Sequence, residues 1–177
     1  KTVEGGLAAV ARVAEEVPLV AVMCGDGPGR PRLERAAREL GLARRVVFKG
    51  YVDNLWELMR GADAFVSLSR FEGCPNVVLE AMACGCPLVV SDIPAHRELL
   101  DERSARFADP EDTARAAAEL KAALTFGGEA RARVARALAA RRPVEATARL
   151  YERLYLGLLG AAYDERLDEQ VSDGEAA

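Results

Sequence analysis

The segment that constrains the fold of this chain most is residues 64–84. It starts with a short apolar run, passes through a polar turn and continues in a second apolar pattern. Residues 64–66 (AFV) predict a buried strand. A helix is predicted from Pro75, because proline is favoured at the first helical position, where its missing N–H costs nothing. A strand followed by a turn and a helix is the repeating unit of parallel α/β folds.

The predicted helix start after this turn is suited to an anion. N–H groups in the first turn of a helix have no partner within that helix, so we expect those of Asn76, Val77 and Val78 to be free. Gly73 lets the backbone come close to a ligand. Phosphate is the usual occupant of such a helix start.

Two carboxylates frame the turn, Glu72 before the helix and Glu80 inside it. A bound phosphate would repel both, so neither is expected to serve the phosphate. Carboxylates accept hydrogen bonds strongly, and hydroxyl groups on either side of a diphosphate would donate them, as in a nucleotide sugar. The alternative is an ordinary helix start, with a favourable acid near the helix dipole and a solvated Glu80 one turn on.

Short apolar runs and helical patterns alternate along the whole chain. The predicted strands are residues 19–23, 46–48, 64–66, 87–90 and 105–108, and the first of them has the continuous apolar character of a strand covered on both faces. The predicted helices are residues 2–16, 33–40, 53–59, 75–84, 96–100, 109–125, 128–140 and 144–162. The alternation predicts a Rossmann-like α/β fold with a mainly parallel sheet, helices on both faces and a C-terminal helical extension.

Three segments are expected from these patterns. Residues 1–142 form a ligand-binding Rossmann-like lobe, residues 143–163 a C-terminal helix introduced by Pro143, and residues 164–177 an acidic flexible tail. Because the tail holds six acids and one arginine, the remainder is nearly neutral, which gives no electrostatic case for nucleic-acid binding. Residues 144–162 carry a broad apolar face, which either packs on its own lobe or stays exposed and drives self-association.

The composition is ordinary for a soluble globular protein, with 50% hydrophobic and 29% charged residues. No apolar run approaches the length of a membrane span, and no signal peptide is visible. The four cysteines lack the spacing of a zinc site and are interpreted as structural thiols in a reducing compartment. We therefore expect a cytoplasmic protein without a metal site, and leave open a peripheral membrane location for a longer protein.

Ligands of parallel α/β sheets bind at the carboxyl ends of the strands. The turns expected there are residues 24–28, 49–53, 68–75 and 91–94. We expect these four turns to line one crevice, which brings the paired acids beside the glycine-rich turn.

Three other candidate sites carry less weight. The pair Gly25 and Gly27 starts like a dinucleotide-binding fingerprint, but Arg30 stands where that fingerprint has its last glycine. His96 is interpreted as a local cap or surface residue and not as a catalytic group. Arg30 and Arg97 are interpreted as solvated helix charges, although either could help to bind a phosphate.

The ordered set of motifs resembles glycosyltransferase family 4, the retaining enzymes with the two-lobed GT-B fold. Residues 72–87 (EGCPNVVLEAMACGCP) carry its two acids, and residues 25–28, 50–52 and 92–98 resemble its glycine-rich turn, base-contacting turn and following loop. The resemblance runs from Lys1 to about Tyr155. It implies that this chain is the C-terminal lobe, which holds the nucleotide-sugar donor.

The resemblance also implies roles for individual residues. Glu72 would be the catalytic residue near the donor sugar, and Glu80 would accept hydrogen bonds from the ribose hydroxyls. Lys1 and the backbone of residues 74–77 would hold the diphosphate. The full set of implied donor-binding residues is Lys1, Gly25, Gly27, Tyr51, Val52, Gly73, Cys74, Pro75, Asn76, Val77 and Glu80.

The implied reaction moves a sugar from a nucleoside-diphosphate sugar to an acceptor, with no required cofactor. The family's arginine upstream of Lys1, the first strand that carries it and the acceptor-binding N-terminal lobe are absent from this sequence. We therefore expect the chain to be inactive alone, with that lobe as its partner. The alternatives are a non-catalytic nucleotide-sugar-binding module and a GT-B epimerase-like domain.

Overall fold

The computed structural model describes residues 3–126 and 128–159. The chain forms two compact units, residues 1–140 and residues 141–177. Two parts of the sequence-based interpretation, the diphosphate contact of Lys1 and the acidic tail 164–177, lie outside the described residues.

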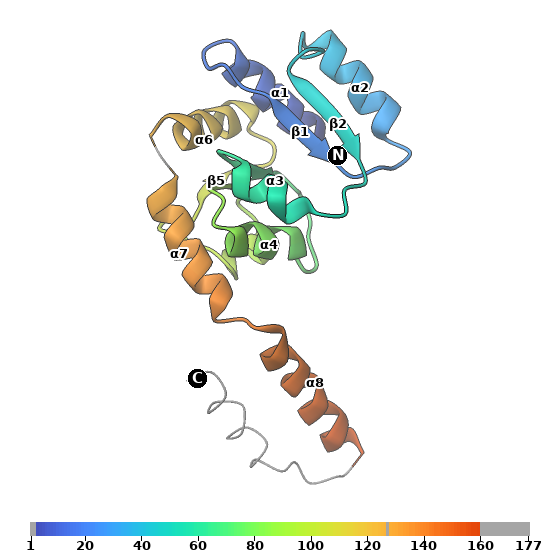
Figure 1. Cartoon of the computed structure of the whole chain (residues 1–177), viewed down its shortest axis with the longest axis vertical. Helices are drawn as coiled ribbons and strands as arrows, with labels where there is room; N and C mark the ends of the chain where they lie inside the picture. The colour runs from blue at the N-terminus through green and yellow to red at the C-terminus, as the bar shows by residue number, and fades with distance from the viewer. Residues whose placement is uncertain (1–2, 127, 160–177) are drawn as a thin grey trace. The chain divides into compact units, whose positions relative to one another are not determined.

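The first unit alternates helices and strands along the chain, which the reader can follow in Figure 1 by its colours from blue at the N-terminus onward. Its strands are β1 (Ala21–Cys24), β2 (Val46–Gly50), β3 (Phe65–Ser67), β4 (Leu88–Ser91) and β5 (Arg106–Ala108). Its helices are α1 (Val3–Ala14), α2 (Arg30–Glu39), α3 (Leu55–Gly61), α4 (Asn76–Cys84), α5 (Pro94–Arg97), α6 (Thr113–Thr125) and α7 (Glu129–Ala140). Each predicted strand is present, displaced by no more than two residues at either end.

All strand pairings between these elements are parallel. β1 pairs with β2 in one sheet, and β4 pairs with β3 on one side and β5 on the other in a second sheet. In the described part of the chain, β1 has no second neighbour and neither has β3, so each keeps one open edge. The predicted Rossmann-like α/β class with parallel strands is confirmed.

β4 is the centre of the first unit, because every one of its residues is buried. Val89 packs into a cluster with α1, α2 and α6, while Leu88 and Val90 pack into a second cluster with α3, α4 and α7. Successive strand residues point to opposite faces, so these two clusters lie on the two faces of the β3–β4–β5 sheet. Figure 1 shows α1 beside α6, which are in contact.

Within residues 3–126 and 128–159, the β1–β2 sheet is covered on one face only, which corrects the prediction for residues 19–23. Ala21 and Met23 pack against the cluster of α1, α2 and α6, whereas Val22 is 45% exposed. In β2, Val46 is buried and Val47 is 42% exposed. A continuous apolar run therefore did not mean two covered faces here, because both helices nearest in sequence, α1 and α2, contribute to the same cluster.

Glycines end two of the helices in the way that their positions predict. Gly41 follows α2 with a φ of +72°, and Gly85 follows α4 with a φ of +71°. After α4, the amide of Cys86 donates to the carbonyl oxygen of Ala81 at 3.1 Å and that of Gly85 to Met82 at 3.0 Å. The left-handed conformation at Gly85 thus satisfies carbonyl groups that the helix leaves free.

The second unit contains α8 (Val144–Leu158), preceded by Pro143 as its N-cap. No residue of α8 is buried, and its apolar side chains are exposed at Leu150, Tyr151, Leu154, Tyr155 and Leu158. The rings of Tyr151 and Tyr155 stack with centroids 6.1 Å apart. The apolar face expected from the sequence is therefore present over α8, and self-association through it stays a prediction.

We predict that Gly85→Ala lowers the free energy of unfolding by about 1 kcal/mol, because a side chain is strained at the left-handed φ. The matched control is Gly6→Ala inside α1, where an added Cβ has no atom within 4 Å. That change should raise the stability by roughly 0.5–1 kcal/mol through helix propensity. Urea denaturation followed by circular dichroism measures both, and equal signs would contradict this account of the C-terminus of α4.

Candidate functional site

The turn between β3 and α4 leaves part of its backbone unpaired, though not the part that the sequence predicted. Pro75 is the N-cap and not the first helical residue. The amide of Asn76 donates to Cys74 O at 2.9 Å and that of Val78 to Pro75 O at 2.9 Å, so neither is free. Of the three amides expected to be available, only that of Val77 donates to no acceptor in the described residues.

Two further amides in the same turn are available. Those of Gly73 and Cys74 donate to no acceptor in the part of the chain that the structure describes, and both residues are exposed. Helix α4 has no acidic residue in its first turn and no side-chain cap. Because nothing neutralises the positive end of the helix dipole, this turn can still receive an anion.

The carboxylates of Glu72 and Glu80 are half-buried. Among residues 3–126 and 128–159, neither takes part in a hydrogen bond or an ion pair. A carboxylate that has lost part of its hydration without gaining a donor is unfavourable in the free protein. Both are therefore ready to accept hydrogen bonds from hydroxyl groups of a ligand.

The first two of the four expected turns are joined by their backbones. Gly25 has a φ of +103° and donates its amide to Gly50 O at 2.7 Å. Gly50 has a φ of +70°, and an added Cβ there would lie 3.2 Å from Nη1 of Arg30. Gly27 is exposed and its amide donates to Asp26 Oδ1 at 2.8 Å. Glycine is needed at Gly25 and Gly50 for the backbone conformation that makes this contact.

The other two turns are joined through a side chain that the sequence analysis did not select. Ser91, the buried last residue of β4, donates its hydroxyl to the carbonyl oxygen of Ser69 at 2.6 Å. Arg70, the next residue, forms an ion pair with Glu111 across a separation of 2.6 Å between Nη2 and Oε2. These two contacts hold the beginning of the turn that carries Glu72.

The described residues therefore bring the four turns together as two pairs. Hydrogen bonds join residues 24–28 to residues 49–53, and residues 68–75 to residues 91–94. Two surface hollows, of about 310 and 210 Å³, lie elsewhere, along Pro18–Val20 with Arg45 and along α2 with β2. Neither hollow includes one of the predicted site residues. Whether all four turns line one crevice stays a prediction.

Arg97 is exposed, as the interpretation of a solvated helix charge requires, but it is also held in a network of surface ion pairs. Its guanidinium donates to both carboxylate oxygens of Asp92, at 2.6 and 2.8 Å, and also pairs with Glu102. It lies 3.7 Å from the ring centroid of Phe107, in a cation–π contact. The hydrogen bonds from Arg97 lower the pKa of Asp92 and that of Glu102, and they raise the pKa of the guanidinium itself.

Arg30, the other cation interpreted as a solvated charge, is also engaged. Its Nε donates to Glu34 Oε1 at 2.8 Å, Nη2 donates to Phe48 O at 3.3 Å, and Nη1 lies 3.9 Å from Asp26 Oδ2. The hydrogen bond to Glu34 raises the pKa of the guanidinium. Because Arg30, Arg70 and Arg97 are all paired with carboxylates, a bound anion would have to compete for them.

His96 is a core residue, which corrects its interpretation as a local cap or surface residue. Its exposed fraction is 0%, and Nδ1 lies 2.9 Å from Ser91 O and 3.1 Å from Ser91 Oγ. Helix α5 has no side-chain cap. A four-residue helix in a loop gave no sign from sequence that its histidine would be covered from all sides.

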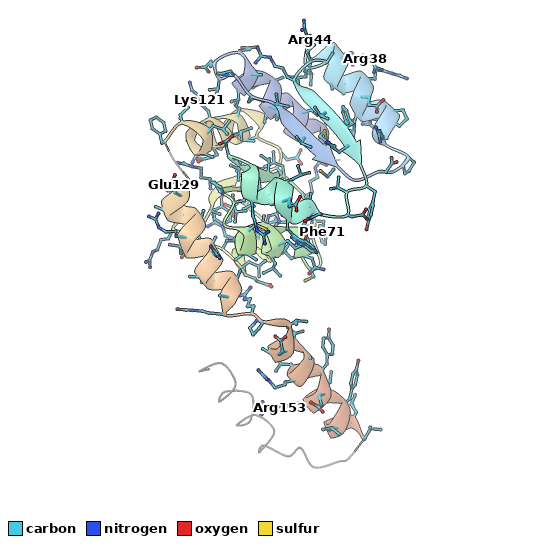
Figure 2. All side chains as sticks on the ribbon, viewed as in Figure 1. Arg38, Arg44, Phe71, Lys121, Glu129 and Arg153 are labelled. Atoms are coloured by element: carbon cyan, nitrogen blue, oxygen red, sulfur yellow. The ribbon has the colours of Figure 1, made fainter. Side chains whose placement is uncertain are left out.

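Aromatic residues of the expected site are exposed. Tyr51 is 83% exposed and therefore lies outside the core, and Val52 is partly buried beside it. Phe71, labelled in Figure 2, is 93% exposed directly before Glu72. The sequence analysis did not select Phe71, because a single apolar residue in a turn has no periodicity from which its exposure can be read.

Among the described residues, no group of three or more His, Cys, Asp and Glu side chains could hold a metal ion. None of the helices described is both long and apolar enough to cross a membrane.

A family model described as "Glycosyl transferases group 1" matches residues 1–125 of this chain. Over 89 residues the chain is 36% identical to N-acetyl-alpha-D-glucosaminyl L-malate synthase of Bacillus anthracis, a match that covers 50% of this chain and 23% of the synthase.

Two solved structures have the same fold. Anabaena HepE, in complex with UDP and glucose, superposes with a TM-score of 0.74 at 23% identity, over 85% of this chain and 44% of its own. The pneumococcal O-GlcNAc transferase GtfA, in complex with UDP and GlcNAc, superposes with a TM-score of 0.79 at 17% identity. The match covers 89% of this chain and 33% of the GtfA chain. The chain thus spans less than half the length of each of these relatives.

We predict that a nucleoside diphosphate slows the alkylation of Cys74, because its amide and exposed thiol lie at the anion-accepting turn. Cys84, at the other end of α4, is the control and should react at an unchanged rate. Cys86 should stay unmodified until the chain unfolds, since burial raises the pKa of its thiol to about 12. Iodoacetamide labelling with peptide mass spectrometry measures all three, and equal protection of Cys74 and Cys84 would contradict binding at this turn.

Proposed function

Because the chain belongs to the family of group 1 glycosyl transferases, we propose that its first unit binds the nucleoside-diphosphate sugar from which a retaining enzyme transfers the sugar. The observation that carries this proposal is the pair of half-buried, unpartnered carboxylates, Glu72 and Glu80, on either side of a helix start with free amides. Acceptor groups flanking a donor-rich turn match a ligand whose hydroxyls flank a diphosphate.

The diphosphate is assigned to the turn between β3 and α4. The free amides of Gly73, Cys74 and Val77 donate to its oxygens, with the positive end of the α4 dipole behind them. Asn76 is placed in the site as the first residue of α4. Its amide does not bind the diphosphate, because it already donates to Cys74 O. Lys1 is assigned to the same diphosphate by the family resemblance.

The two acids are assigned to the two sugars of the ligand. Glu80, inside α4, accepts hydrogen bonds from the ribose hydroxyls, and Glu72 accepts them from the transferred sugar. UDP bound together with glucose in HepE, and UDP with GlcNAc in GtfA, supports a sugar nucleotide as the ligand class. At the other pair of turns, the exposed backbone of Gly25 and Gly27 leaves room for the donor, and Tyr51 with Val52 flanks the base.

The proposed reaction breaks the bond between the anomeric carbon and the phosphate oxygen. The electron pair of that bond leaves with the diphosphate, and the sugar becomes cationic in the transition state. The turn amides stabilise the charge that grows on the leaving oxygen. The negative charge of Glu72 faces the sugar as it becomes positive, so Glu72 is the proposed catalytic residue. The acceptor oxygen then bonds to the same face of the sugar, and its proton passes to the departing diphosphate oxygen on that face, so the configuration is retained.

The acceptor is assigned to a surface that this chain does not supply. The matches span less than half of each relative described above, which supports a second lobe as the partner in the complete reaction. We propose that the amides suffice for the diphosphate without a required cofactor. Exposed free thiols at Cys24 and Cys74 support a reducing compartment, and hence the cytoplasm, as the location.

We predict that Glu80→Ala weakens the binding of both the nucleoside diphosphate and the nucleotide sugar. Glu72→Ala should weaken the binding of the nucleotide sugar and leave the binding of the nucleoside diphosphate unchanged. A lost hydrogen bond to a charged group is worth about 1.5–3 kcal/mol, so each loss should be roughly 10- to 100-fold in Kd. A thermal-shift screen of UDP-, GDP- and ADP-sugars identifies the ligand, and isothermal titration calorimetry measures the Kd values.

Glu39→Ala, which removes an exposed carboxylate at the end of α2, is the matched control and should leave both Kd values unchanged. Equal losses for both ligands in both site variants would remove the separate roles of the two acids. Absence of binding by every nucleotide would reject the donor site itself.

We predict that the 177-residue chain binds its donor but does not transfer the sugar, because no acceptor is held beside the anomeric carbon. Liquid chromatography of the nucleotides should show release of the nucleoside diphosphate at the rate of the protein-free solution. Transfer to an acceptor by this chain alone would contradict the assignment of the acceptor to another lobe. Conversion of the nucleotide sugar into its epimer would favour the epimerase alternative.

A further inference from the structure

His96 occupies a place in the core for which its polarity is not needed. Its exposed fraction is 0%, and Nε2 is buried without a hydrogen-bond partner among the described residues. A buried polar atom without a partner destabilises the folded protein, which is a cost that an apolar side chain avoids. A leucine would fill similar space without that cost. The presence of a histidine at this position is therefore accounted for by the hydrogen bonds of its other ring nitrogen, Nδ1.

The partners of Nδ1 determine where the ring carries its proton. Nδ1 lies 2.9 Å from the carbonyl oxygen of Ser91, and a carbonyl oxygen can only accept. The Ser91 hydroxyl donates its single proton to another carbonyl oxygen, that of Ser69, at 2.6 Å. Toward Nδ1, at 3.1 Å, Ser91 Oγ can therefore only accept. Nδ1 is thus the protonated nitrogen and donates to both oxygens of Ser91.

These bonds form a directed chain from His96 through Ser91 to Ser69. Ser91 ends β4, and Ser69 lies in the turn three residues before Glu72. A hydroxyl that accepts from Nδ1 is oriented to donate in a single direction, and hydrogen bonds in such a chain polarise one another. The core of the unit is thereby linked to the backbone of the turn.

We propose that His96 is a positioning residue for the donor site. By orienting the Ser91 hydroxyl toward Ser69 O, it fixes the start of the turn whose later amides and whose Glu72 face the donor. This inference rests on the proposed function for its effect on binding. The hydrogen-bond chain itself can be tested without a ligand.

Three variants of His96 separate a positioning role from a packing role. They differ in whether, and where, the new side chain carries an N–H hydrogen-bond donor. His96→Asn retains an amide nitrogen at the branch position of Nδ1, whereas His96→Gln moves it toward the position of Nε2 and His96→Leu has none. Ser91→Ala removes the middle of the chain. Ser104→Ala is the matched control, because Ser104 is also 0% exposed and hydrogen-bonded, but to Asp101 and not to the turn.

Calorimetry with the nucleoside diphosphate identified by the screen should show a loss of about tenfold in affinity for His96→Gln, His96→Leu and Ser91→Ala. His96→Asn should stay within about threefold of the unchanged protein, because its donor is retained. The double change of His96→Leu with Ser91→Ala should cost no more than the larger single change, since both break the same chain. Ser104→Ala should lower the stability and leave the affinity unchanged.

A ligand-free experiment keeps this inference distinct from the proposed function. The sequence contains one histidine, so two-bond ¹H–¹⁵N spectra of the protein contain one imidazole ring. Protonation at Nδ1 is expected, together with amide shifts over residues 68–75 in His96→Leu that are smaller in His96→Asn. Protonation at Nε2 alone, or equal shifts in both variants, would overturn the positioning role. So would unchanged affinity in His96→Leu. If no nucleotide binds the unchanged protein while the spectra are as expected, the proposed function fails and the link to the turn stands.

Discussion

The site described above depends on the parallel pairing of β4 with both of its neighbours. Parallel strands end at the same edge of a sheet, so β3 and β4 release their following turns side by side. The Ser91 hydroxyl, at the last residue of β4, can reach Ser69 O only because the two strands end in register. β4 in turn is fixed by its burial on both faces. The packing of a central strand thus determines the position of Glu72, which lies in no regular element.

Charge pairing around the turns limits what can bind a diphosphate there. The guanidinium groups of Arg30, Arg70 and Arg97 each have carboxylate partners within the same unit. A ligand would gain from them only by displacing those partners, which are partly solvated and hence weakly held. Backbone amides need no such exchange. In the proposed site, recognition of a diphosphate by the described residues would therefore rest on the backbone amides more than on these three cations.

The elements of the first unit were predictable from sequence because they depend on local patterns. The apolar runs located β1 to β5, and Gly41 located the end of α2. What failed depends on contacts across the fold. The burial of His96 and the pairing of Arg97 with Asp92 and Glu102 require tertiary neighbours that no spacing indicates. The hydrogen bonds of the Asn76 and Val78 amides were not predicted for a local reason. Pro75 is the N-cap and not the first helical residue, so these amides donate to carbonyl groups of the turn, those of Cys74 and Pro75.

The open edges of β1 and β3 bear on how this chain behaves at high concentration. In the part of the chain that the structure describes, each of these strands offers unpaired backbone groups along one side. On the face of the β1–β2 sheet that none of the described helices covers, Val22 in β1 is also exposed. Such an edge is a template for strand addition from another molecule. At high concentration the chain is therefore exposed to aggregation by intermolecular β-pairing at these edges.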